Sequence, residues 1–293
     1  MTRMRVTQNM LSTNMLKNLS NSYSEMGKYM EQLNTGKKIN KPSDDPVVAM
    51  NGMGYRSELA QVEQFKRNTN EVHNWFDNTD AALDQATQAM QRLRELAVQA
   101  SNDTYDASER QNIAAEAKQI KLDLIDIANT QVNDKYIFNG TNTNEAPFDG
   151  NGDPINIMNS NVEIEVAKGT VLNVNVSAEA VFGSGALFDR IDNFITKLET
   201  NTGDIAASLG EIDDDIDNII NARADLGARM NRLELVENRL DQQEVIATQT
   251  MSKNEDIDYA KVITQLITQE SIHRAALSSG SRIIQPTLVD FLR

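Results

Sequence analysis

One stretch of the chain, residues 62–100, repeats apolar or small residues at alternating steps of three and four. This spacing returns a side chain to the same helix face every 3.5 residues on average, as in a coiled-coil seam. Neither proline nor glycine interrupts residues 57–101, which predicts one helix about 65 Å long at 1.5 Å per residue. Such a helix needs partner helices, from the same chain or from neighbours, to bury its seam. The ladder is Val62, Phe65, Thr69, Val72, Phe76, Thr79, Leu83, Ala86, Met90, Leu93, Ala97 and Ala100.

Two further stretches show the same helical periodicity. One follows a turn near residues 102–108 and carries Ile113, Ala117, Ile120, Leu124, Ile127 and Gln131; the other carries Ile212, Ile216, Ile219, Leu226, Leu233, Val236, Leu240 and Ala247. We expect the acidic run 213–215 to be a solvated face near a helix start. The bundle seam expected from all three stretches is Val72, Phe76, Leu83, Met90, Leu93, Ile120, Leu124, Leu233, Val236 and Leu240.

The two ends of the chain predict helices whose apolar residues spread over a wide face. A wide face indicates more than one neighbouring helix. Ordering each residue costs about 1–2 kcal/mol, so we expect both ends to be disordered in the isolated chain and helical in an assembly. The expected assembly interface is Met10, Leu11, Met15, Leu16, Leu19, Val262, Ile263, Leu266, Ile267, Leu277, Leu288 and Phe291.

Residues 33–47 separate the first helix from the long one. Gly36 is the expected end of the first helix. Asp44 or Asp45 can cap the next helix, with Pro46 in its first turn. The two carboxylates could instead form a metal or acid–base pair, but capping accounts for both.

Residues 140–185 are rich in Asn, Gly and Thr and predict a small β-module. Alternating apolar residues at 162–166 and 172–176 flank Lys168-Gly169, which indicates a hairpin. Residues 149–153 imitate the start of a calcium-binding loop, but Pro154 replaces its glycine and Ser160 its glutamate, so this motif is rejected. Because the strands pair locally, we expect residues 142–184 to be replaceable by a short linker.

Composition excludes several classes of function. The chain has no cysteine, which rules out disulfides and thiol chemistry, and its net charge of −15 argues against nucleic acid as a partner. Residues 1–44 and 272–293 are nevertheless basic, so the acidity lies in the middle. No run reaches the ~18 apolar residues of a membrane-spanning helix, and no secretory signal peptide is visible.

Nothing in the sequence makes a positive case for an enzyme. Phosphate loops, dinucleotide glycine patterns and HExxH motifs are absent, and no cofactor is expected. His73 and His273 lie far apart on predicted helices, where packing or surface roles explain them better than catalysis.

The expected fold is therefore mainly α: an elongated antiparallel helical bundle or coiled coil built from both chain ends, with a small inserted β-rich module. The expected domains are a terminal coiled coil from residues 1–44 and 256–293, a helical rod from 45–139 and 186–255, and the β-module at 140–185.

Four segments of the chain resemble bacterial flagellins and their relatives: residues 5–16, 33–47, 91–104 and 258–293. They occur at both ends and in the family's order. Within the family, the opening residues 4–8, the segment 136–141 followed by Pro147-Phe148, and the single small β-insert resemble hook–filament junction proteins more than filament flagellins.

The resemblance implies a structural role in the bacterial flagellum, connecting the hook, through the preceding hook-associated protein, to the flagellin filament. It implies an extracellular location after export through the flagellar type III apparatus. The implied partners are lateral copies of the same chain, the preceding hook-associated protein, flagellin and an export chaperone of the FlgN type. A short filament flagellin and a soluble coiled-coil adaptor are the alternatives.

Overall fold

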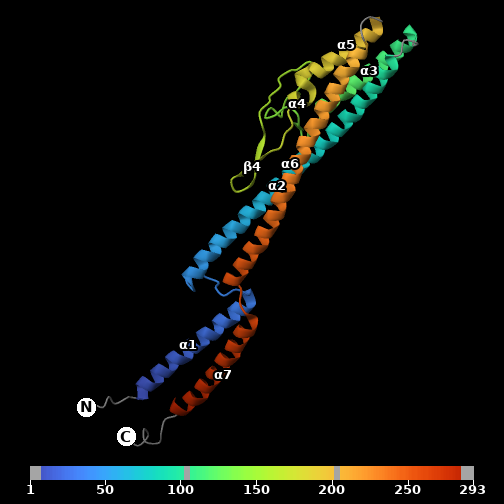
Figure 1. The fold of residues 1–293 in the computed structure, drawn as a ribbon. Helices are drawn as coiled ribbons and strands as arrows, with labels where there is room; N and C mark the ends of the chain where they lie inside the picture. The colour runs from blue at the N-terminus through green and yellow to red at the C-terminus, as the bar shows by residue number, and fades with distance from the viewer. Residues whose placement is uncertain (1–7, 102–105, 201–204, 285–293) are drawn as a thin grey trace, which may run out of the picture. The chain divides into compact units, whose positions relative to one another are not determined.

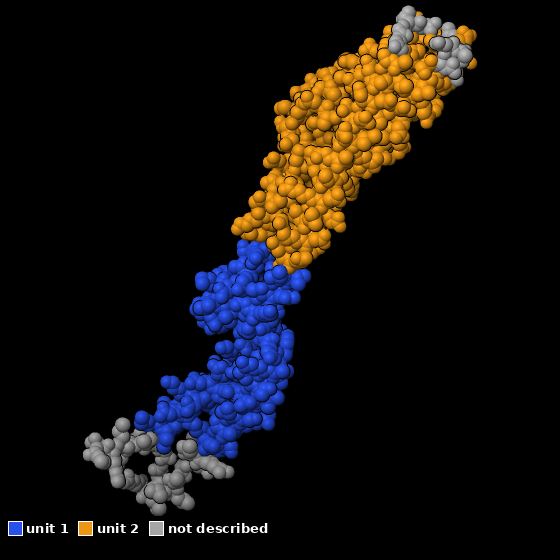
Figure 2. All heavy atoms as spheres, viewed as in Figure 1, with its two compact units in different colours: residues 1–60, 244–293 blue, residues 61–243 orange. Residues whose placement is uncertain are grey.

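The computed structural model describes residues 8–101, 106–200 and 205–284. Two compact units are present, unit 1 with residues 1–60 and 244–293 and unit 2 with residues 61–243 (Figure 2). In the part of the chain described, no helix is long and apolar enough to cross a membrane. The helices are α1 (Gln8–Thr35), α2 (Pro46–Ala100), α3 (Ala107–Ala128), α4 (Ala178–Phe182), the 3-10 turn η1 (Gly183–Gly185), α5 (Ala186–Thr200), α6 (Ile205–Glu255) and α7 (Tyr259–Ile284); the strands are β1 (Gln131–Val132), β2 (Lys135–Tyr136), β3 (Glu163–Ala167) and β4 (Thr170–Asn173) (Figure 1).

Local hydrogen bonds and backbone conformation determine where α1 ends and where α2 begins. Gly36 has a positive φ of 70°, which favours glycine, and α1 ends just before it. The Asp45 carboxylate accepts hydrogen bonds from the backbone N–H groups of Val47 and Val48, so it caps α2. Asp44 accepts from the N–H groups of residues 40 and 41 instead, and these bonds lower its pKa. Both carboxylates thus serve the turn and the cap.

The heptad ladder of α2 lies along the core of unit 2. Phe65 is partly buried, and the other eleven ladder residues are buried. The ten residues expected to form the bundle seam are all buried as well. In the second ladder Gln131 is an exception, because α3 ends at Ala128 and Gln131 belongs to β1.

Ion pairs show that α2 and α6 run antiparallel within unit 2. As the residue number rises along α2, the number of the partner on α6 falls. Individual surface pairs contribute about 0.2–1 kcal/mol, so the apolar seam dominates the stability and the pairs specify the register. The ion pairs join Lys66 to Asp241 (2.8 Å), Asp80 and Asp84 to Arg223 (2.7 and 2.6 Å), and Arg94 to Asp213 (2.5 Å), and a contact of 2.9 Å between His73 and Glu237 fits the same order.

The acidic run at 213–215 is only partly a solvated face, and the expectation for Asp215 was wrong. Its side chain is 2% exposed and forms an ion pair with Arg190 of α5, whose Nε lies 2.9 Å from Oδ2. Burial raises the pKa of Asp215 even though Arg190 opposes that shift. Because Arg190 belongs to another helix, the local sequence at residues 213–215 does not predict this ion pair.

The β-module contains the expected hairpin. β3 and β4 pair antiparallel with Ile164 opposite Leu172, and the register shifts between Glu165 and Ala167. The short helix α4 that follows was not expected. It is capped by Ser177, whose Oγ accepts from the N–H of Ala180.

The module shares the core of unit 2, which argues against the expectation that it can be removed. Phe148 packs edge to face with Phe188 of α5, and Phe182 stacks on Phe188; Phe148 and Phe182 also pack edge to face with each other. The ring centroids of these three pairs are 5.0–5.8 Å apart. Asn68 of α2 donates to the carbonyl of Glu165, and Arg229 of α6 donates to that of Asn175. The module side chains in the core are Phe148, Val166, Ala167, Leu172, Val174, Val176, Ala178, Val181 and Phe182.

Replacing residues 142–184 with a Gly/Ser linker should therefore abolish cooperative unfolding of unit 2. Burial of each large apolar side chain contributes about 1.5–3 kcal/mol to the free energy of unfolding. The deletion removes several of these side chains, and their summed contribution is comparable with the ~5–15 kcal/mol that stabilises a domain. Circular dichroism during heating measures this. Lys168→Ala at the hairpin turn is the control and should melt like the wild type; an unchanged melt for the deletion would contradict the shared core.

Leu93→Asp should disrupt the helical core of unit 2. Leu93 is fully buried in the α2 seam. A carboxylate at this position would lower the free energy of unfolding by several kcal/mol, as the most destabilising point mutations do. A thermal melt measures the loss, and a midpoint within a few degrees of the wild type would refute the seam. The exposed neighbour Val98 gives a matched control, Val98→Asp.

Candidate assembly interface

Helices α1 and α7 pair antiparallel in unit 1. Gln269 of α7 donates to the hydroxyl of Ser22 at 3.1 Å. One residue further along α1, the ring of Tyr23 lies 6.2 Å from that of His273. Closer to the chain ends, Met15 fills the space above Gly280, where an added Cβ would lie 1.4 Å from the methionine Cε. These contacts fix one register between the helices.

The α1–α7 pair leaves most of its apolar surface uncovered. Among residues 10–60 and 244–281, whose side chains the structure describes, only Ala247, Ile257 and Val262 are buried apolar residues, whereas the large core cluster lies in unit 2. This exposed apolar surface is therefore the candidate interaction site of unit 1. Among the side chains of unit 1 that the structure describes, fifteen large apolar ones are exposed: Met10, Leu11, Leu16, Tyr23, Met30, Val47, Met50, Met53, Val245, Ile246, Tyr259, Ile263, Ile267, Ile272 and Leu277.

The residues expected at the assembly interface fall into three groups. Val262 is buried, and Met15, Leu19 and Leu266 are partly buried. The exposed members are Met10, Leu11, Leu16, Ile263, Ile267 and Leu277. Leu288 and Phe291 lie outside the described residues.

Sequence reasoning missed a further part of this surface. Val47, Met50 and Met53 lie in the first turns of α2, and Val245 and Ile246 lie near the end of α6. The spacing of three residues from 47 to 53 is a helical signal that could have identified the α2 face. It was overlooked because the regular ladder begins only at Val62.

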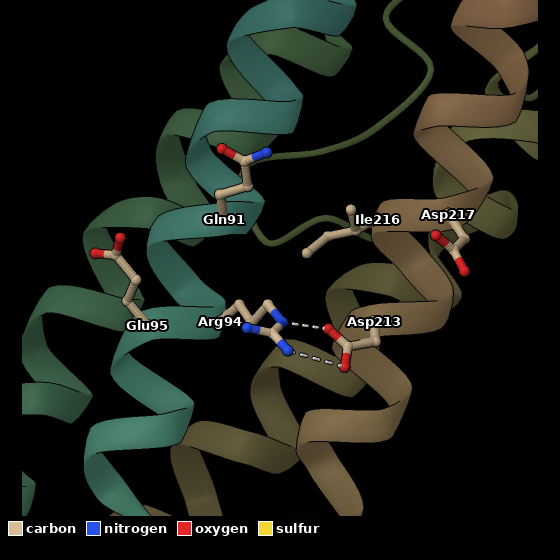
Figure 3. Close-up of a pocket in the computed structure, with 6 residues that line it drawn as sticks. All are labelled: Gln91, Arg94, Glu95, Asp213, Ile216 and Asp217. Atoms are coloured by element: carbon tan, nitrogen blue, oxygen red, sulfur yellow. Dashed lines mark hydrogen bonds and ion pairs between the residues drawn. The ribbon is translucent and has the colours of Figure 1, made fainter.

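A shallow depression in unit 2 shows no arrangement for catalysis. Its volume is about 590 Å³, and Figure 3 shows Arg94 and Asp213 pointing toward each other across it. Hydrogen bonds to Asp213 raise the pKa of Arg94. The lining residues are Gln91, Arg94, Glu95, Asp213, Ile216 and Asp217, and none of these six is paired as nucleophile and base.

No cluster of three or more His, Asp or Glu side chains that could hold a metal occurs among the described residues. At the segment that imitates a calcium loop, the Asp149 carboxylate accepts hydrogen bonds from the backbone N–H groups of Asn151 and Asp153. These bonds lower the pKa of Asp149. Its carboxylate therefore closes a local turn.

Comparison with known proteins identifies the family. The N-terminal helical region of bacterial flagellin matches residues 6–143, and the C-terminal helical region of bacterial flagellin matches residues 209–292. The chain belongs to the bacterial flagellin family, a family of structural flagellar proteins. The segment between the two matches contains β3, β4, α4, η1 and α5.

Relatives over nearly the full length include flagellar hook-associated protein 3. The protein from Escherichia coli (strain K12) is 28% identical over 300 residues, which cover 93% of this chain and 95% of the relative. The same protein from Salmonella typhimurium is 25% identical with the same coverage. Flagellin of Bacillus subtilis (strain 168) is 28% identical over 93% of this chain and 94% of its own length.

Solved structures share the fold of much of this chain. A putative flagellar hook-associated protein from Vibrio parahaemolyticus matches with a TM-score of 0.68 and 22% identity, covering 73% of this chain and 100% of the other. FlgL from Bacillus cereus matches with a TM-score of 0.60 and 24% identity, covering 68% and 99%. Membership of the flagellin family argues against the alternative of a soluble coiled-coil adaptor.

Limited proteolysis tests the prediction that the terminal helices depend on neighbours for their order. We expect trypsin to trim up to roughly the first 40 and last 35 residues of the isolated chain, because the pair covers so little apolar surface. Mass spectrometry of the resistant fragment gives the boundaries. Survival of the full-length chain for as long as the fragment would show that α1 and α7 are stable alone.

Proposed function

We propose that this flagellin-family chain is the structural protein at the junction between the flagellar hook and the filament. The observation that carries this proposal is the match to flagellar hook-associated protein 3 over 93% of this chain and 95% of the relative. The match extends across both helical regions and the insert, so it concerns the whole architecture. The fold shared with FlgL structures supports the same role.

The exposed surface of unit 1 suggests how the protein would act. Covering fifteen half-exposed apolar side chains would stabilise an assembly by on the order of 10 kcal/mol before entropic costs. The occupants we propose are lateral copies of the same chain, with the preceding hook-associated protein on one side of the junction and flagellin on the other. The residues proposed for these contacts are the six exposed members of the expected interface together with Leu288 and Phe291.

Before assembly, the same surface would need protection. We propose that a chaperone of the FlgN type covers it in the cell and that the chain leaves through the flagellar type III apparatus. Exposed apolar faces on amphipathic helices are the surfaces that helix-in-groove partners recognise. The protein would then reside in the extracellular part of the flagellum.

A filament flagellin is the second candidate, because flagellin of Bacillus subtilis matches over 93% of this chain. A deletion strain separates the two roles. If the chain forms the junction, the mutant should carry hooks without filaments and release flagellin into the medium. Normal filaments in the mutant would refute the junction role, and shortened or missing filaments without released flagellin would favour the filament role.

Complementation with surface variants tests the proposed interface. Ile267→Asp places a charge on the exposed face of α7, whereas Val171→Asp places one on exposed β4; the wild-type side chains are 57% and 43% exposed. Both variants should fold, since neither site is in the core. Only Ile267→Asp should fail to restore filaments in electron micrographs, and equal complementation would contradict the interface.

A further inference from the structure

Two helix breaks in unit 1 are joined to each other by backbone hydrogen bonds. One break follows α1 at Gly36, and the other lies between α6 and α7. The N–H of Ile257 donates to the carbonyl of Gly36 at 3.0 Å, and the N–H of Lys38 donates to that of Glu255 at 2.6 Å. Residues 36–38 and 255–257 thus form a short antiparallel bridge, here called the clasp.

A buried carboxylate holds the clasp to α2. Glu255 is 3% exposed, and its Oε2 lies 2.7 Å from a guanidinium nitrogen of Arg56 and 3.4 Å from Nζ of Lys37. Lys37 also contacts Asp256 at 2.6 Å. The hydrogen bond between Lys37 and Asp256 raises the pKa of the first and lowers that of the second. Lys37 on one strand of the clasp is thus paired with Glu255 and Asp256 on the other, and Lys38 donates to the carbonyl of Lys253.

Gly52 explains how Glu255 fits against α2. A Cβ added to Gly52 would lie 2.5 Å from Oε1 and 3.3 Å from Cδ of Glu255. Glycine in a helix is less stable than alanine, and at this position the missing side chain leaves the space that the Glu255 carboxylate occupies. Gly54, two residues further on, has nothing within 4 Å of an added Cβ.

We propose that Glu255, seated over Gly52, makes the clasp a stop that prevents unravelling of α1 and α7 from spreading into α2 and α6. The α1–α7 pair buries little apolar surface, so it opens most easily. Opening beyond the clasp requires loss of the Arg56–Glu255 ion pair and both backbone bonds at once. Elements of low and high stability can then coexist in one chain. The device works in the same way at the junction or in a filament.

Trypsin digestion of the full-length protein tests the clasp, because Arg56 and Lys253 are themselves cleavage sites beside it. When opening is fast relative to cleavage, the cleavage rate follows the population of the open form. In the wild type we expect early cleavage after Lys17, Lys28, Lys261 and Arg274, and slow cleavage after Arg56 and Lys253. Mass spectrometry over a time course gives each rate.

Gly52→Ala should speed cleavage after Arg56 and Lys253 by about tenfold or more, as expected for lost hydrogen bonds to charged groups. Gly54→Ala is the matched control and should be cleaved no faster than the wild type, or up to about fivefold more slowly, because alanine favours the helix. The two substitutions add the same methyl group to the same helix, so helix propensity alone predicts the same sign for both.

Glu255→Gln keeps the shape of the side chain and removes its charge, and it should also speed both cleavages. Far-ultraviolet circular dichroism melts confirm that unit 2 stays folded in each variant. Equal rates after Arg56 in Gly52→Ala and Gly54→Ala, or wild-type rates in Glu255→Gln, would overturn the proposal. Such a result would leave the junction role untouched, since the deletion strain decides that role independently.

Discussion

Burial of a 3.5-residue seam is the constraint on which the rest of the structure depends. A helix as long as α2 presents a stripe of side chains that must be covered along its whole length. In unit 2 the chain covers this stripe with its own α3, α5, α6 and β-module. In unit 1 only the pair α1 and α7 and the ends of α2 and α6 are available, so apolar side chains stay exposed. Folding and the proposed assembly therefore depend on the same requirement, which is that apolar helix faces be covered. Unit 2 covers them with other parts of the same chain, whereas unit 1 leaves them to neighbouring molecules.

Much of the fold could be predicted from the sequence, because the signals are local. The ladder from Val62 to Ala100, the end of α1 at Gly36 and the hairpin at Lys168-Gly169 depend on residues within a few positions of each other. Periodicity reports which face of a helix is apolar. It does not report which element covers that face.

Three failures of sequence reasoning involve distant partners. Asp215 looked solvated because its neighbours in the chain are acidic, yet Arg190 pairs with it from another helix. The β-module looked separable because its strands pair locally, although Phe182 lies in the same core as Phe188. Likewise Gly52 gives no sign in the sequence that it accommodates a carboxylate 203 positions away.

The contact of Met15 with Gly280 has a consequence for symmetry. A pair of amphipathic helices can slide by a turn or a heptad and still bury part of its apolar surface, but each slipped form shows neighbours a different outline. Closely packed identical copies form a regular array only when every copy offers the same outline. The seat of Met15 over Gly280 favours one register, because a slipped pair would lose this contact. A single preferred register would give every copy the same outline.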